Sequence, residues 1–127
     1  GSGGGMSALL TELLSKRRRL DERIRAEVAR IEAGDITADA VVVATAQILD
    51  VPIRVVLSET RTRRIVRARW VAAKVLRDGL MLSLPQIADA LNRRDHTTIL
   101  HGLREIEKHK DLCTKANDIR RSLWSVA

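Results

Sequence analysis

The stretch Arg94-Asp95-His96-Thr97-Thr98-Ile99-Leu100-His101 decides the fold of this chain. It follows a short amphipathic segment, residues 83–91, across the polar break Asn92-Arg93-Arg94. Two short helices joined by a tight turn, the second opening with small hydrogen-bonding side chains, are typical of a helix-turn-helix that reads DNA. The pattern therefore predicts a helix-turn-helix around this stretch.

Local signals mark both helices of the predicted motif. Ser83 and Gln86 have the spacing of a capping box, and Pro85 is tolerated in a first helical turn. Asp95 is a suitable N-cap for the second helix, whose apolar residues recur at steps of four and three (Ile99, Leu103 and Ile106). This spacing leaves the polar residues largely on the opposite face (His96, Thr97, His101 and Arg104).

Helical periodicity extends through the rest of the chain. Ala8 to Ala33 contains no Gly or Pro and predicts one long helix that ends at Gly34. Thr37 is a plausible N-cap for the next helix, and Pro52 suits the first turn of a short helix through Leu57. Two more helices are expected, one from the Arg-rich segment to Gly79 and one over about 112–124. Because no alternating run of β-branched residues occurs, the predicted fold class is all-α.

These elements suggest three regions. Residues 1–5 look like an expression scar, and residues 6–34 form an N-terminal helix serving as a linker, a dimerisation element or a partner-binding element. Residues 35–127 are expected to form a single helix-turn-helix domain of the Trp-repressor-like kind. A homodimer or a protein partner would bind through Ala8–Ala33.

The positive charge is concentrated in one window. Between residues 54 and 77 a single acidic residue, Glu59, accompanies eight basic residues, so this window alone accounts for the formal net charge of +7 (Arg54, Arg61, Arg63, Arg64, Arg67, Arg69, Lys74 and Arg77). A solvated helix usually mixes both signs at i,i+4 spacing. The pattern favours an anionic partner such as double-stranded DNA.

Other functional classes find little support in the sequence. Cys113 is the single cysteine, and no Cys/His cluster has zinc spacing. No catalytic constellation stands out, so we expect neither an enzyme nor a cofactor. With no Phe or Tyr and only two Trp, single-strand binding by stacking is disfavoured. No secretory or membrane-spanning segment is found, and we expect a soluble protein in the cytoplasm, associated with the nucleoid.

Residues 36–112 resemble the C-terminal DNA-binding domain of the bacterial replication initiator DnaA. The resemblance is carried by Leu57-Ser58 with the Arg cluster that follows, by residues 83–87, and by the run from Arg94 to His101. The Arg-Asp-His-Thr-Thr sequence is highly specific to that family.

The resemblance implies a role for each matching residue. Arg61 would enter the minor groove, and four residues would contact bases in the major groove of a DnaA-box-like duplex (Asp95, His96, Thr97 and Thr98). Eight further positions are expected to contact phosphates (Arg63, Arg69, Arg77, Leu84, Pro85, Arg93, Arg94 and His101).

The chain also departs from the family pattern. Asn92 and Arg93 stand where the family usually has two glycines, so the turn and the preferred box are expected to differ. Glu59 occupies a usually basic position, and Trp70 a usually polar one. No G-x-x-x-x-G-K-[ST] phosphate loop occurs, so we expect no nucleotide and no ATP-driven assembly by this chain alone.

The sequence thus favours a sequence-specific duplex-DNA binder that regulates transcription or replication through DnaA-box-like sites. Two alternatives stay open. One is a Trp-repressor-like regulator with an unrelated operator. The other is a DNA-tethered protein-interaction module that uses the N-terminal helix.

Overall fold

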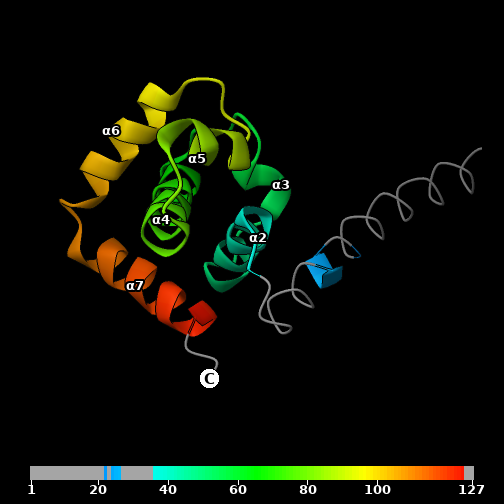
Figure 1. Cartoon of the computed structure of the whole chain (residues 1–127). Coiled ribbons are helices and arrows are strands. Elements are labelled where there is room, and N and C mark those ends of the chain that lie inside the picture. The colour runs from blue at the N-terminus through cyan, green and yellow to red at the C-terminus, as the bar shows by residue number, and fades with distance from the viewer. Residues whose placement is uncertain (1–21, 23, 27–35, 125–127) are drawn as a thin grey trace, which may run out of the picture.

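The structure is a computed structural model that describes residues 22, 24–26 and 36–124 (Figure 1). Over the continuous part of this range the chain forms helices only: α2 (Ala38–Ile48), α3 (Ile53–Val56), α4 (Arg63–Leu80), α5 (Leu84–Ala90), α6 (His96–Ile106) and α7 (Lys110–Trp124). No strand occurs among the described residues, and the prediction of an all-α fold is confirmed.

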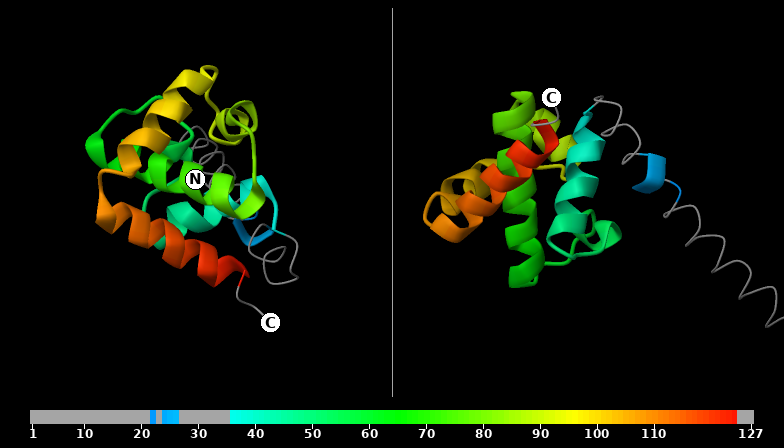
Figure 2. Two further views of the ribbon diagram at one scale, coloured as in Figure 1. Left: turned by 60° about the vertical axis from the view of Figure 1, so that its left-hand side comes forward. Right: turned by 90° about the horizontal axis from the view of Figure 1, so that it is seen from below.

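Helix α4 is the centre of the molecule. It packs against α2, α6 and α7, and Figure 1 shows it nearly end-on with the other helices arranged around it. The apolar stripe expected from the sequence is buried along its length (Ile65, Ala68, Ala72, Val75 and Leu76). Small alanines within this stripe allow neighbouring backbones to approach closely. The right-hand view of Figure 2 shows α7 crossing α4 obliquely.

The prediction that α4 ends at Gly79 is wrong by one residue. Gly79 lies inside the helix, where a Cβ would collide with the indole ring of Trp124. The helix instead ends at Leu80, and Met81 adopts the left-handed conformation with φ of 56°. Gly79 therefore serves the packing of α7 on α4, and not the turn that terminates the helix.

The predicted helix caps are present. The Thr37 hydroxyl accepts the N–H of Ala40 at 3.1 Å at the start of α2. At α5 both halves of the capping box form, since Ser83 Oγ accepts from Gln86 N and Gln86 Oε1 accepts from Ser83 N. The expected short helix is present as α3, but Pro52 is its N-cap and not part of its first turn, and Leu57 is its C-cap.

Helices α5 and α6 form the helix-turn-helix. They pack against each other and on α4, and their inward residues are buried (Ile87, Leu91, Ile99, Leu103 and Ile106). The connecting turn includes Asn92 with φ of 58°, a left-handed conformation that asparagine adopts more readily than most residues. Helix α7 begins at Lys110, two residues earlier than expected.

The predicted N-terminal helix, Ala8–Ala33, lies largely outside the described residues. Residues 22 and 24–26 are helical, and Ile24 packs partly against the core. The proposed linker, dimerisation and partner-binding roles of this helix remain predictions. No helix in the described part of the chain combines the length and apolar character needed to cross a membrane.

Candidate nucleic-acid interface

The first turn of α6 is built around Asp95. Its carboxylate Oδ1 accepts the N–H of Thr97 at 2.8 Å, which closes the N-terminus of the helix. Hydrogen bonds from the Thr97 backbone and side chain hold the pKa of Asp95 below its usual value. Because a carboxylate has about four acceptor positions, the capping bond leaves acceptor capacity for a base donor.

The predicted base-reading residues form one exposed cluster. Asp95, His96, Thr97 and Thr98 are all exposed, while Ile99 in the next position is buried against the core. Burial of Ile99 fixes the helix rotation, so the first turn of α6 projects from the domain. The structure thus brings together the four side chains that the resemblance assigns to the major groove; their base contacts remain a prediction.

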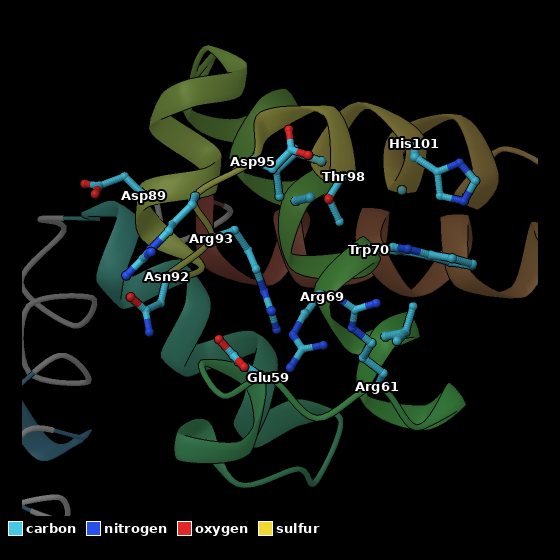
Figure 3. A pocket seen from close by; sticks show the side chains of 15 residues that line it. Glu59, Arg61, Arg69, Trp70, Asp89, Asn92, Arg93, Asp95, Thr98 and His101 are labelled. Carbon is cyan, nitrogen blue, oxygen red and sulfur yellow. The ribbon is translucent and has the colours of Figure 1, made fainter.

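A groove of about 690 Å³ runs between this turn and the segment that carries Arg61 (Figure 3). It is lined by α4, by the helix-turn-helix turn, by α6 and by part of the loop of residues 57–62, here called the Arg61 loop. Four arginines and three acidic residues line its walls, which leaves a small excess of positive charge (Arg61, Arg69, Arg93 and Arg94; Glu59, Asp89 and Asp95). The expected minor-groove residue and the expected major-groove turn therefore border one basic groove.

Arg69 does not fit the phosphate contact expected of it. Only 8% of the residue is exposed. Its guanidinium donates to four backbone carbonyls at 2.6–3.2 Å (Val55, Val56, Ser58 and Thr60). Burial, together with the nearby charges of Arg93 and Arg61, lowers the pKa of Arg69 to about 10, so it stays a cation at neutral pH.

We therefore revise the role of Arg69 from phosphate contact to anchor of the Arg61 loop. A signal for this role was present in the sequence. Arg69 follows Ile65 by four residues and precedes Leu76 by seven, which places it on the buried stripe of α4. An arginine in such a stripe needs internal partners, and backbone carbonyls at the end of a short helix supply them.

Arg77 lies within an ion-pair cluster that the sequence analysis missed. Lys74 Nζ is 3.2 Å from Asp78 Oδ2 and 3.1 Å from Glu107 Oε1. Arg77 Nε is 3.1 Å from Asp78 Oδ1, and its Nη2 is 3.6 Å from Glu107 Oε1. The i,i+4 spacing of Lys74 and Asp78 could have indicated this pairing. The Arg77 side chain is 39% exposed and a guanidinium has five N–H donors, so a phosphate contact by Arg77 remains a prediction.

The side chain of Arg93 is also directed into the domain. Its guanidinium Nη2 donates to the carbonyl of Ser58 in the Arg61 loop, and the residue is partly buried. The side chain of the adjacent Asn92 donates to the carbonyl of Leu57 at 3.1 Å. The expected phosphate contact of Arg93 does not fit this arrangement, because the side chain is directed into the domain.

The remaining expected phosphate contacts lie at accessible positions. Arg63, Arg94 and His101 are exposed, as is Pro85 at the N-terminus of α5, while Leu84 is half-buried. Backbone N–H groups at a helix N-terminus suit a phosphate oxygen. These contacts remain predictions, and the structure leaves their side chains or backbone open to solvent.

No role was predicted for Trp70. In the structure its side chain packs between α4 and α6. Its indole lies over Gly102, where an added Cβ would come within 2.5 Å of the ring. The ring centroid is 5.9 Å from that of His109, with the planes tilted by 30°. Trp70 therefore sets the distance of α6 from α4 and requires a glycine at position 102.

Comparison with known proteins agrees with this geometry. Residues 38–106 match the protein family described as "Bacterial dnaA protein helix-turn-helix". The chain is 42% identical over 76 residues to the chromosomal replication initiator protein DnaA of Neisseria meningitidis serogroup C and to that of Neisseria gonorrhoeae. The matched segment is 60% of this chain and about 15% of each relative.

A solved structure shares the fold. It is titled as the crystal structure of a DNA replication initiation factor, and it superposes with a TM-score of 0.62 at 23% sequence identity, covering 96% of this chain and 36% of that one. The matched family unit is a DNA-binding helix-turn-helix and not itself a catalytic domain. Because the family match covers more than half of the chain, this protein belongs to the bacterial DnaA helix-turn-helix family and is a DNA-binding protein.

Proposed function

We propose that this chain binds double-stranded DNA at DnaA-box-like sequences and thereby regulates transcription or replication. The observation that carries the proposal is the exposed polar first turn of α6 beside the basic groove that Arg61 borders. Short side chains there allow a helix to approach base edges closely.

In the major groove, each residue type of this turn has a defined chemistry. The Asp95 carboxylate accepts from cytosine N4, and the Thr97 and Thr98 side chains offer a hydroxyl to base edges and a methyl group to thymine. His96 donates or accepts according to its tautomer. The cap at Asp95 supports this function because it holds the turn in place before DNA arrives.

In the minor groove, Arg61 would be the reading residue. A narrow A·T-rich minor groove has an enhanced negative potential that attracts a guanidinium group. Arg61 is exposed on the loop that precedes α4, and Arg69 anchors the backbone of that loop. The phosphate backbone would then be contacted around the groove by Arg63, Arg94, His101 and the N-terminus of α5.

Selection of bound duplexes from a random pool tests this function. We expect enrichment of one DnaA-box-like sequence, with its A·T-rich part placed where Arg61 reaches the minor groove. Enrichment of an unrelated operator would instead support a regulator of the Trp-repressor-like kind, and absence of any enriched sequence would contradict sequence-specific binding.

A further inference from the structure

The Arg61 loop is held by side chains from two other parts of the fold. Two carbonyls at the end of α3 (Val55 and Val56) and three in the loop (Leu57, Ser58 and Thr60) accept hydrogen bonds from the side chains of Arg69, Asn92 and Arg93. Leu57 packs against the core at the start of the loop, while residues 59–62 are exposed. The side-chain bonds therefore help to hold the part of the loop that leads to Arg61.

Two of the three donors belong to the turn of the helix-turn-helix. Asn92 and Arg93 lie 35 residues along the chain from the carbonyls that they contact, Leu57 and Ser58 respectively. Asp95, which caps the recognition helix α6, follows two residues after Arg93. The same turn thus contacts the loop that carries Arg61 and introduces the helix that carries the major-groove residues.

The chemistry of these two positions explains why the link exists in this chain. Asn92 adopts a positive φ, which a glycine would adopt at least as easily, but only a side chain can donate to Leu57. At Arg93 the guanidinium donates from Nη2 to the Ser58 carbonyl, which it shares with Arg69, while its Nε is buried without a hydrogen-bond partner among the described residues. A pair of glycines would preserve the turn and remove both hydrogen bonds.

We propose that Asn92 and Arg93 are positioning residues that hold the Arg61 loop in a fixed relation to α6, so that the two grooves of the duplex are read as one unit. This inference rests on the proposed function. It makes specificity in the minor groove depend on two residues that act through the Arg61 loop, and it restricts the chain to sites in which the A·T tract lies at one spacing from the major-groove bases.

A double-mutant cycle on the selected duplex tests the link. The quantity measured is the ratio of dissociation constants for that duplex and for a copy whose A·T tract is replaced by G·C pairs. We expect Arg61→Ala to lower this discrimination about tenfold, which is a typical effect of one lost groove contact. Asn92→Gly with Arg93→Gly should lower it by a similar factor, and the combined variant by little more than Arg61→Ala alone.

Controls separate positioning from a general loss of structure. Discrimination at the major-groove bases and cooperative thermal unfolding should persist in the glycine pair. Arg94→Ala, an exposed neighbour, should reduce affinity additively with Arg61→Ala. If the glycine pair does not fold, Arg93→Met removes the donor while retaining Asn92 and the aliphatic stem, and it enters the same cycle.

The outcomes are distinct. Non-additivity confined to the A·T tract supports the link, and full additivity overturns it while leaving the proposed function intact. If the unmodified chain does not prefer the selected duplex to random DNA, the proposed function fails, and this inference fails with it.

Discussion

The Asp95 carboxylate accepts the N–H of Thr97 and thereby satisfies one of the free backbone N–H groups at the N-terminus of α6. The same residue is expected to accept from a base, and the two tasks are compatible because they use different acceptor positions of one carboxylate. At the residue scale, the proposed interface is therefore built from side chains that also define the helix terminus.

Thr97→Ala should weaken binding to the selected duplex by roughly 1–3 kcal/mol and binding to random DNA very little, because only base contacts carry sequence information. Fluorescence anisotropy titrations on both duplexes measure this difference. Thr114→Ala, at an exposed threonine on α7, is the matched control and should change neither affinity. Equal losses on both duplexes would remove Thr97 from the base-reading set.

Glu59 lines the basic groove and opposes its charge. We expect Glu59→Lys to raise affinity for all duplexes and to steepen the dependence of log K on log salt by about one, because one more phosphate is neutralised. Asp118→Lys on α7 makes the same charge reversal outside that groove. An equal effect of the two variants would indicate a general charge effect and no contact at position 59.

At the scale of the elements, α4 is both the core helix and the support of the interface. Its buried face contains one arginine, Arg69, whose guanidinium binds the end of α3 and the Arg61 loop. A second charged side chain on its buried face, Lys74, pairs with Asp78 and Glu107 and joins α4 to the end of α6. Two charged side chains thus fix the elements on either side of α4.

Arg69→Met should lower the free energy of unfolding by roughly 2–4 kcal/mol, because buried carbonyls lose their donors. Urea denaturation measures this loss. The salt dependence of DNA binding by the folded fraction should be unchanged, since the guanidinium is engaged internally. Arg67→Met on the same helix is the control for stability. A slope lower by about one with unchanged stability would restore the phosphate role.

The Lys74–Asp78 pair predicts a pH dependence of stability. Burial alone would raise the pKa of Asp78, but hydrogen bonds and charge from Arg77 and Lys74 lower it below 3.8. The stabilisation is therefore present above pH 3.8 and is lost as the pH falls through the lowered pKa. Asp78→Asn should remove about 1 kcal/mol at neutral pH and flatten the acid limb of the stability curve. An unchanged acid limb would contradict the pairing.

At alkaline pH, the contribution of Lys74 to stability changes with pH in the opposite direction to that of Asp78. Burial would lower its pKa, but the hydrogen bonds and charges of Glu107 and Asp78 outweigh burial and raise it above 10.5. Its contribution to stability is present below pH 10.5 and is lost as the pH rises through the raised pKa. Thermal unfolding of the unmodified chain and of Asp78→Asn, measured across alkaline pH, checks this direction.

At the scale of the whole molecule, the core that the structure describes is built from residues 36–124, with Ile24 packed partly against it. We expect a chain without residues 6–33 to unfold cooperatively and to keep its base discrimination. Light scattering and DNA titration of the two forms measure mass and affinity. A doubled mass of the full chain together with weaker binding after truncation would assign dimerisation to the N-terminal helix.

The local features of the fold were predictable from neighbouring residues. The capping box at Ser83, the cap at Asp95 and the buried face of α6 depend on residues two to four positions apart, and all were found as expected. Gly79 was misassigned because a helix-ending glycine and a glycine under a tryptophan look the same in sequence. Only the approach of α7 distinguishes them.

The sequence by itself determined the all-α fold, the helix-turn-helix and the exposed turn from Asp95 to Thr98, because periodicity and capping are short-range properties. The tertiary structure decided which arginines bind within the protein and which remain exposed. A guanidinium can donate to a phosphate or to a backbone carbonyl, and the choice depends on backbone that lies 9 to 35 residues away. Arg69 and Arg93 face inward for that reason, while Arg61 and Arg94 remain open to solvent.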